Sequence, residues 1–376
     1  MKKCMFATFL MTFILTNLMA QKYLLGVGTY TTNSASKGIY LYEFDSKTGA
    51  FKFLNTTEAF NPSYLHFTDN GKFLYVANED INDAEKDKGA VSAYKLDEKT
   101  HQLEFLNSQP SIGGGPCFVN TDKDDKNVFV ANYGGGSFVT YKLGEDGKIL
   151  DQHQLVQHYG KGPNINQYHA HAHSTWLAPD QKHLFVVDLG EDRVYKYNFN
   201  PNAAQPISDG TPAFFKVPDG YGPRHLVFSP NGKQVYVLNE LESKLMAFDY
   251  NKGDLKEIQT LTTTDIESPD HDKGSSAIKI SKDGKFVYAS NRGKTNTISI
   301  FKVLSDGKLA LVENVSVKLH PRDITLTPDG NWLFSASRDQ DVVELFKIDK
   351  KTGKLTKKTE EISIPKPICV VFTTYK

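Results

Sequence analysis

The residues of this sequence that could do chemistry are one histidine, one glutamate and two arginines, namely His173, Glu240, Arg224 and Arg292. An imidazole titrates near neutral pH and can accept or donate a proton. A guanidinium binds a carboxylate or phosphate through two parallel hydrogen bonds. A carboxylate beside two arginines should stay ionised, and it could orient a water or accept a proton. Together these groups suit acid–base chemistry on a small anionic molecule, provided that the fold brings them together.

The fold is predicted by an internal repeat of about fifty residues, in which a strand-like phrase of four residues recurs. After a weaker first copy at Gly26-Val27-Gly28-Thr29, the copies are Tyr75-Val76-Ala77-Asn78, Phe129-Val130-Ala131-Asn132, Phe185-Val186-Val187-Asp188, Tyr236-Val237-Leu238-Asn239, Tyr288-Ala289-Ser290-Asn291 and Phe334-Ser335-Ala336-Ser337. Most copies follow a Gly or Asp turn, as at Asp283-Gly284, and precede another alternating run, which is the pattern of β-hairpins. Four short antiparallel strands per repeat are typical of a propeller blade. We therefore expect an all-β, seven-bladed β-propeller, closed when the C-terminal strand near Cys369 completes the first blade.

Equivalent repeat positions should form rings around the axis of a propeller, because the innermost strands line its central channel. One register, at the start of the inner strands, contains Ser63, Cys117, His173, Arg224, Ser276 and Arg322. A second register, directly after each recurring phrase, contains Tyr30, Glu79, Tyr133, Leu189, Glu240, Arg292 and Arg338. Both registers should lie at one mouth of the channel. Such a cluster of ionisable groups indicates a functional site, and the alternative is a set of compensating salt bridges that only fill the channel.

Within these registers we expect His173, Glu240, Arg224 and Arg292 to be catalytic. The residues expected to bind substrate are His171, Arg322, Arg338, Glu79, Tyr133 and Ser63.

The run His169-Ala170-His171-Ala172-His173 leaves a second interpretation open. At strand spacing its three imidazoles would point to one face and could hold zinc with further ligands. Alternatively, one histidine is a general acid or base, while His169 and His171 lie in a polar loop above the mouth. We favour the second interpretation and expect no metal and no cofactor.

Composition narrows the class of protein. The 44 Lys and Arg residues balance the 44 Asp and Glu residues, so there is no basic footprint for nucleic acid. A basic start, an apolar run and the small residue Ala20 indicate a signal peptide over residues 1–20, cleaved before Gln21; an uncleaved membrane anchor is the alternative. The mature chain, residues 21–376, should be one propeller domain that is periplasmic or secreted, without a membrane segment, and a monomer.

Two smaller features have structural interpretations. Cys117 and Cys369, the cysteines that remain after cleavage, should be buried and inert thiols. The glycine runs at 113–115 and 134–136 precede no helix, so we interpret them as tight turns and not as phosphate-binding loops.

Short motifs in order along nearly the whole mature chain resemble the propeller lactonase family, which includes the bacterial propeller-type 6-phosphogluconolactonase and the fungal carboxymuconate lactonising enzyme. The motifs are Gly28-Thr29-Tyr30-Thr31, Asn61-Pro62-Ser63, Val130-Ala131-Asn132-Tyr133, Asp188-Leu189-Gly190-Glu191-Asp192-Arg193, Gly222-Pro223-Arg224-His225, Asn239-Glu240-Leu241 and Ser290-Asn291-Arg292. The resemblance implies a metal-independent reaction at the propeller centre. It matches His173 to the family's catalytic histidine, and Arg224, Glu240 and Arg292 to its anion-binding and acid–base residues. Ser337-Arg338 departs from the family's usual Asn-Gln pair and adds a positive charge to the mouth.

We therefore expect an extracytoplasmic lactonase, similar to 6-phosphogluconolactonase, that hydrolyses a small lactone. The signal peptide favours an unphosphorylated sugar lactone or another acidic lactone as substrate. Two alternatives stay open: a lactonising cycloisomerase of the muconate type, which needs the same acids, bases and cations, and a non-catalytic propeller that binds a protein or a glycan.

Overall fold

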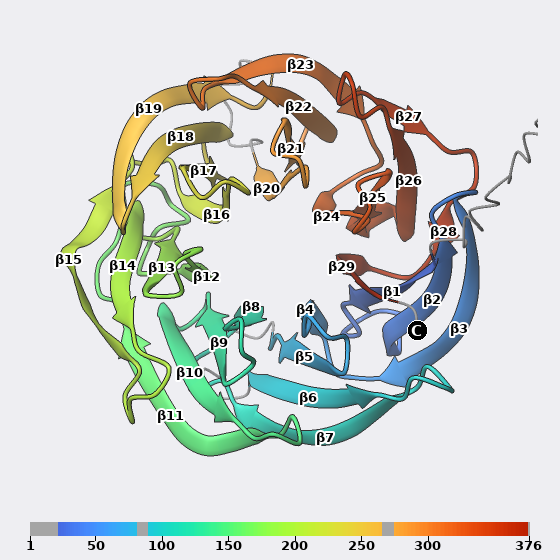
Figure 1. Ribbon diagram of the computed structural model, residues 1–376, viewed down its shortest axis with the longest axis horizontal. Helices are drawn as coiled ribbons and strands as arrows, with labels where there is room; N and C mark the ends of the chain where they lie inside the picture. Colours follow the sequence, from blue (N-terminus) through green and yellow to red (C-terminus); the bar gives the residue numbers. More distant parts are fainter. Residues whose placement is uncertain (1–21, 81–88, 265–273, 375–376) are drawn as a thin grey trace, which may run out of the picture.

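The structure, a computed structural model, describes residues 22–80, 89–264 and 274–374, and the predicted signal peptide lies outside these ranges. The described chain forms seven antiparallel sheets around one axis (Figure 1). Each sheet is a blade with a path of four hydrogen-bonded strands, which confirms the predicted seven-bladed β-propeller. In these ranges no helix is both long enough and apolar enough to span a bilayer.

The strands of each blade are named from the axis outwards. Blade 1 consists of β29 (Pro367–Thr374), β1 (Lys22–Thr29), β2 (Gly38–Asp45) and β3 (Ala50–Glu58). Blade 2 consists of β4 (Pro62–Phe67), β5 (Phe73–Asn78), β6 (Ala90–Leu96) and β7 (Leu103–Pro110). Blade 3 consists of β8 (Pro116–Thr121), β9 (Asn127–Asn132), β10 (Ser137–Leu143) and β11 (Ile149–Gln157). Blade 4 consists of β12 (Ala172–Leu177), β13 (His183–Asp188), β14 (Arg193–Phe199) and β15 (Ile207–Lys216).

The last three blades follow the same order. Blade 5 consists of β16 (Pro223–Phe228), β17 (Gln234–Asn239), β18 (Lys244–Asn251) and β19 (Asp254–Thr262). Blade 6 consists of β20 (Ser275–Ile280), β21 (Phe286–Asn291), β22 (Thr297–Val303) and β23 (Leu309–Ser316). Blade 7 consists of β24 (Pro321–Leu326), β25 (Trp332–Ser337), β26 (Val342–Ile348) and β27 (Leu355–Lys357), with β28 (Ile362–Ser363) also paired to β26 and a short 3₁₀ helix, η1 (Arg338–Gln340), after β25.

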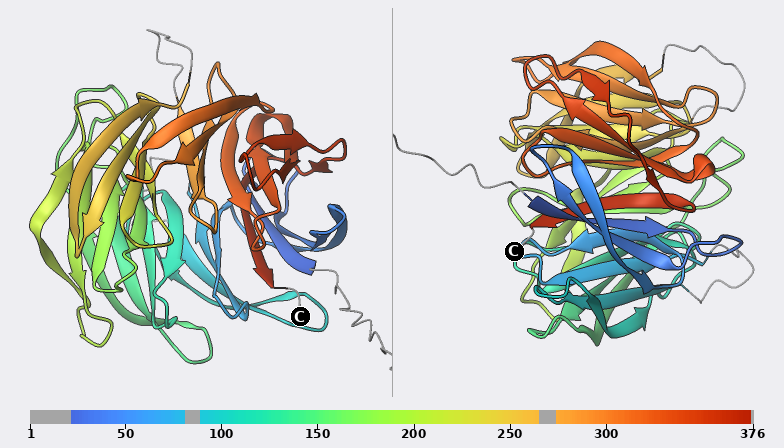
Figure 2. Two further views of the ribbon diagram at one scale, coloured as in Figure 1. Left: turned by 45° about the horizontal axis from the view of Figure 1, so that its top comes forward. Right: turned by 90° about the vertical axis from the view of Figure 1, so that its right-hand side faces the viewer.

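The two ends of the described chain close the ring. The last strand, β29, pairs antiparallel with β1, so that Tyr23 faces Thr374 and Val27 faces Val370. Figure 2 shows this red strand beside the blue strands of the N-terminal blade. Closure confirms the predicted role of the C-terminal strand, and it removes the open sheet edges that an incomplete first blade would leave.

The hydrophobic core lies between neighbouring blades. Between blades 1 and 7, for example, the buried ring of Phe44 packs edge-on against Phe334 and Trp332, with ring centroids 4.9 and 5.9 Å apart. Aromatic pairs in this geometry add to the energy of burial. The alternating apolar residues of each repeat therefore hold adjacent blades at a fixed distance from the axis.

A β-bulge interrupts the innermost strand pair of every blade near its start. In blade 4, Ala172 pairs with Asp188 and Ser174 pairs with Val187, so His173 is the extra residue. In blade 5, Pro223 pairs with Asn239 and His225 pairs with Leu238, so Arg224 is the extra residue. A bulge bends its strand and redirects a side chain. The residues at equivalent positions around the ring are Ile368, Ser63, Cys117, His173, Arg224, Ser276 and Arg322.

Candidate active site

The centre of the site is one carboxylate between two arginines. Glu240 follows β17 directly. Its Oε2 lies 2.9 Å from Nε of Arg224, which is on β16, the innermost strand of the same blade. Its Oε1 lies 2.9 Å from a terminal nitrogen of Arg292, which follows β21 in the neighbouring blade. The predicted registers therefore place these three side chains in direct contact across blades 5 and 6.

Backbone carbonyl groups hold the two arginines in place. Arg224 donates a hydrogen bond to the carbonyl oxygen of Ser276. Arg292 donates to the carbonyl oxygens of Gly274 and Ser275, at 3.1 and 3.3 Å. Arg224 is 3% exposed and Arg292 is 8% exposed, so these contacts replace most of the water that each guanidinium loses.

The neighbouring charges keep the carboxylate of Glu240 and the guanidinium of Arg224 ionised. Burial by itself would raise the pKa of Glu240, but Arg292, Arg224 and Arg322 together lower it below its ordinary value. Burial lowers the pKa of Arg224 to about 10, against the opposing effect of Glu240, so its guanidinium stays protonated at neutral pH. Glu240 is therefore an anion at neutral pH, and it positions two cations.

A second carboxylate lies on the other side of the mouth. Glu79 follows β5, and its Oε2 accepts a hydrogen bond of 2.8 Å from the Tyr30 hydroxyl. The same oxygen lies 3.7 Å from a terminal nitrogen of Arg322, whose guanidinium carbon is 5.5 Å from the centre of the Tyr30 ring. Arg322 is thus attracted to Glu79 at a distance too long for a hydrogen bond.

Arg322 differs from the other arginines of the mouth in its hydrogen bonding. Among the described residues, no carbonyl or carboxylate oxygen accepts a hydrogen bond from its guanidinium, whereas Arg224 and Arg292 each donate to a backbone carbonyl oxygen and form an ion pair with Glu240. Arg224, Arg292 and Arg322 also outnumber the carboxylates of Glu240 and Glu79 by one charge. Among the described residues of this group there is therefore one positive charge more than there are carboxylates, and one guanidinium has unused donors.

His173 lies within the field of these cations. Burial, followed by Arg224 and Arg322, lowers its pKa well below the ordinary value, so its imidazole is neutral at neutral pH. Its Nδ1 lies 3.6 Å from Sγ of Cys117, the bulge residue of blade 3, while Nε2 makes no hydrogen bond to a described residue. Burial raises the pKa of Cys117 to about 12, so this neighbour is a thiol and not a thiolate. Cys117 and Cys369 are both buried and unpaired by a disulfide, as expected.

The other histidines of the run do not share a strand face with His173, because β12 begins at Ala172. His169 and His171 lie in the preceding loop, in agreement with the second interpretation of the run. The loop nevertheless buries His171, whose Nδ1 lies 2.9 Å from the carbonyl oxygen of Tyr133 and whose ring stacks on the Tyr133 ring at 4.3 Å. Tyr133 also contacts His173 edge-on at 5.4 Å, so it forms part of the wall beside the imidazole.

Two residues expected to bind substrate have other partners in the structure. The hydroxyl of Ser63 donates to the carbonyl oxygen of Pro116 at 3.2 Å. Arg338 lies in η1 and forms two hydrogen bonds with the carboxylate of Asp339, at 2.7 and 3.1 Å. The positive charge that Arg338 adds to the mouth is therefore balanced by the adjacent Asp339, and its expected role in substrate binding stays a prediction.

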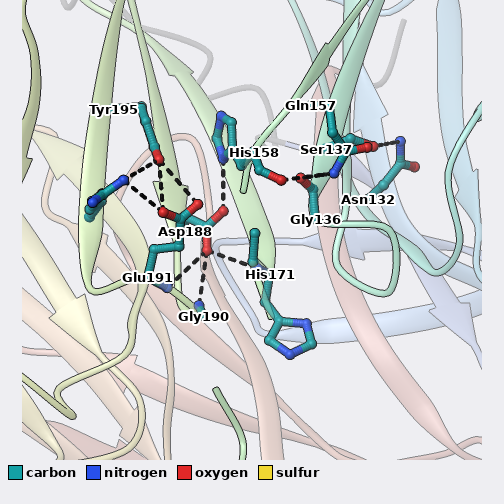
Figure 3. Close-up of polar contacts among 12 residues, drawn as sticks. Asn132, Gly136, Ser137, Gln157, His158, His171, Asp188, Gly190, Glu191 and Tyr195 are labelled. Atoms are coloured by element: carbon teal, nitrogen blue, oxygen red, sulfur yellow. Dashed lines mark hydrogen bonds and ion pairs between the residues drawn. The ribbon is translucent and has the colours of Figure 1, made fainter. Parts of the chain in front are cut away.

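One group of side chains has ligand atoms close enough for a metal ion among the described residues: His158, Asp188 and Glu191. Its atoms already have partners, as Figure 3 shows. Asp188 binds His158 Nδ1 at 2.7 Å and accepts three backbone N–H groups, of His171, Gly190 and Glu191. Glu191 is bound by Arg193 and Tyr195. The geometry is that of a satisfied network that fixes the loop before β12, and it includes neither His169 nor His173.

Sequence reasoning gave no role to three residues near the centre. Tyr30 stands in the second register but was not expected to bind Glu79, and Cys117 was expected only to be inert. His320 belongs to neither register; burial, followed by Arg292 and Arg338, lowers its pKa to about 3. The position of His320 directly before Pro321-Arg322 is the only signal that could have indicated it.

Comparisons with known proteins agree with the fold and identify the family. The model of the family described as "Lactonase, 7-bladed beta-propeller" matches residues 24–372. The chain is 35% identical to a Bacillus subtilis 6-phosphogluconolactonase over 93% of this chain and 98% of the relative, and 34% identical to a 6-phosphogluconolactonase of Formosa agariphila over 90% and 96%. The structure of a periplasmic gluconolactonase of Pseudomonas aeruginosa superimposes with a TM-score of 0.88 at 30% identity, over 94% of this chain and all of that one.

Proposed function

Because the chain belongs to the seven-bladed β-propeller lactonase family, we propose that it hydrolyses a small sugar lactone or acidic lactone at the mouth of its channel. Membership of this family makes the chain a lactone-hydrolysing enzyme, a carboxylic-ester hydrolase. The observation that carries the finer proposal is the arrangement, within the described part of the chain, of a neutral His173 beside three arginines and two carboxylates. The single excess positive charge suits a reaction that creates one carboxylate.

Each group has a distinct part in the proposed reaction. The neutral imidazole of His173 accepts a proton at Nε2 from a water as the water oxygen attacks the lactone carbonyl carbon. Arg322, whose donors are unused, stabilises the negative charge that develops on the carbonyl oxygen and afterwards on the product carboxylate. The ring C–O bond then breaks, and the leaving alkoxide takes the proton from the His173 imidazolium. The product is a hydroxy acid, whose acidic proton goes to solvent.

Glu240 contributes without exchanging a proton. Its contacts with Arg224 and Arg292 fix both guanidinium groups at the mouth before substrate binds. Groups that are oriented in advance cost no reorganisation during the reaction. The arginines then hold the hydroxyl and carbonyl oxygens of the lactone in position for attack. We propose that this chemistry proceeds without a metal ion, and a chelator tests that part directly.

The test is turnover by the purified mature chain of D-glucono-δ-lactone, its 6-phosphate and a muconate-type acid, each with and without EDTA and corrected for spontaneous hydrolysis. We expect hydrolysis of at least one lactone, unaffected by EDTA, and a loss of at least a hundredfold in His173→Ala with an unchanged melting temperature. His153→Ala, at an exposed histidine of β11, is the matched control and should keep full activity. Full activity in His173→Ala, or turnover of the muconate-type acid alone, would overturn the proposal.

We also propose that the enzyme acts outside the cytoplasm. The basic and apolar character of residues 1–20 supports this location, as does the periplasmic relative from Pseudomonas aeruginosa. Expression of the full chain followed by fractionation and N-terminal sequencing tests it. The expected product lies outside the inner membrane and begins at Gln21; an unprocessed chain in the cytoplasm would contradict it.

A further inference from the structure

A second cavity, of about 200 Å³, lies between the inner strands at the end of the axis opposite the mouth. Its polar lining comes from β4, β20 and β24, with Tyr64, His66, Lys279, Asp323 and Thr325. His66, Lys279 and Thr325 each lie three residues beyond a bulge position, which at the rise of a β-strand places them roughly 10 Å from the mouth. None of these five residues belongs to the proposed catalytic group.

Aromatic side chains separate this cavity from the mouth. Tyr64 stacks on Phe118 with a centroid distance of 4.4 Å, and His225 contacts the rings of Phe118 and Trp176 at 5.5 and 6.1 Å. His225 also contacts His173 edge-on at 5.2 Å. The mouth and the far cavity are therefore distinct spaces, divided by a layer of packed rings.

The far cavity contains a carboxylate with an unused oxygen. Asp323 is 4% exposed, and its Oδ2 accepts the backbone N–H of Val370 at 3.0 Å. No described residue hydrogen-bonds to its Oδ1, although the Cys369 thiol lies near enough to the carboxylate to interact with it. A buried polar atom without a partner costs free energy comparable to a lost hydrogen bond, so it indicates that a bound molecule supplies the donor.

The same cavity contains a cation without a counterion. The ammonium group of Lys279 forms neither a hydrogen bond nor an ion pair within 4 Å of any described residue, including Asp323 on the neighbouring inner strand. The apolar part of the lining, Phe67, Leu326, Pro328, Val370, Val371 and Phe372, offers no further polar partner. A matching ligand must therefore present an anionic group to Lys279 and a donor to Asp323.

We propose that this cavity is a second small-molecule site, which binds a carboxylate that bears a hydroxyl or ammonium group on the adjacent carbon. The ligand's carboxylate binds the Lys279 ammonium, and its adjacent donor binds Oδ1 of Asp323. Both 2-hydroxy acids and 2-amino acids have this chemistry. The site is independent of catalysis at the mouth, since it shares no residue with the proposed reaction.

Isothermal titration of the full mature chain with sodium gluconate, and separately with L-leucine, tests the site and identifies which donor it prefers. Lys279→Met keeps the length of the side chain but removes its charge, and Asp323→Asn keeps the acceptor for Val370. We expect at least one of the two probes to bind to the wild type. In each of the two variants the affinity of the far cavity for that probe should be at least tenfold lower than in the wild type. Lys302→Met, at an exposed lysine of β22, is the matched control and should bind like the wild type.

Gluconate could also occupy the mouth as a reaction product, and the number of bound molecules resolves this. If the proposed function is correct, the wild type binds one molecule more than Lys279→Met, which retains the site at the mouth and lactone turnover within about twofold. If the proposed function is wrong, Lys279→Met still loses one molecule, and only the turnover assays fail. Absence of binding by both probes, or titrations that are identical in the wild type and Lys279→Met, would overturn the second site.

Discussion

Replacement of Arg322 by methionine should lower the rate of lactone hydrolysis strongly while it changes the stability of the propeller only a little. Methionine retains most of the aliphatic volume and removes the guanidinium. The wild-type group has one ionic contact, at 3.7 Å to Glu79, and no hydrogen bond to a described acceptor. Glu79 keeps its hydrogen bond from Tyr30 in the variant. The variant also loses the repulsion by Arg322 that helps to lower the pKa of Arg224.

The size of each effect follows from these contacts. Loss of a donor that stabilises a developing oxyanion typically lowers kcat by 10²- to 10³-fold, or about 3–4 kcal/mol in transition-state free energy. A loose ion pair contributes about 1 kcal/mol or less to folding. We therefore expect Arg322→Met to lose two to three orders of magnitude in kcat/KM, while the free energy of unfolding changes by about 1 kcal/mol.

The assay combines initial rates over a range of lactone concentrations with urea unfolding of the same preparation. Arg338→Met is the comparison, because Asp339 already engages that guanidinium, and its kcat/KM should stay within about fivefold of the wild type. Near-wild-type turnover in Arg322→Met would refute the assignment of Arg322. A loss of stability of about 3–5 kcal/mol would instead show that the arginine is part of a buried structural pair.

Three further perturbations test other parts of the site and fold. Glu240→Gln leaves two buried arginines without their shared anion, so urea unfolding should show a loss of about 3–5 kcal/mol, whereas Glu313→Gln, in a half-exposed pair with Lys354, should cost under about 1 kcal/mol. His66 has its pKa lowered by burial from 6.5 to about 4, so the unfolded chain binds more protons at this residue than the folded chain between these values. The contribution of His66 to stability should therefore be full above pH 6.5 and fall by up to about 1.4 kcal/mol per pH unit below it. The other buried histidines act equally in both proteins, so the difference in the free energy of unfolding between the wild type and His66→Gln should show this slope, and a difference that does not change with pH would contradict it. A Cβ at Gly135 would lie 2.9 Å from the backbone nitrogen of Gly114, so Gly135→Ala should lower the free energy of unfolding by about 1–3 kcal/mol, and an unchanged melting temperature would contradict the tight packing of the two turns.

The repeat explains why so much of the fold could be predicted. Equivalent residues of successive units occupy equivalent places in a ring, so the phrase that ends at Asn239 and the one that ends at Asn291 predict that Glu240 and Arg292 are neighbours. In the structure these two residues form an ion pair, with a terminal nitrogen of Arg292 2.9 Å from Oε1 of Glu240. The strand-closing role of the C-terminal segment followed in the same way, from one strand too many at the end and one too few at the start.

Details that depend on competition between neighbouring groups could not be predicted. The sequence shows that Arg338 reaches the mouth register, but the adjacent Asp339 forms two hydrogen bonds with it. The alternation of the three-histidine run resembles a strand, yet the strand begins only at Ala172, because Asp188 holds the backbone of His171 in the preceding loop. Such outcomes depend on which of several possible partners is closest, and periodicity alone contains no information about that.

Because of the bulges at the start of the inner strands, the residue type at a site position can change without loss of backbone pairing in the sheet. His173 and Arg224 are skipped by the strand ladders of their blades, so no backbone pairing depends on which side chain they bear. The corresponding positions in other blades already contain isoleucine, serine and cysteine. A propeller of this kind can therefore acquire a different substrate by exchanging residues at a few such positions, with the strand pairing of its blades unchanged.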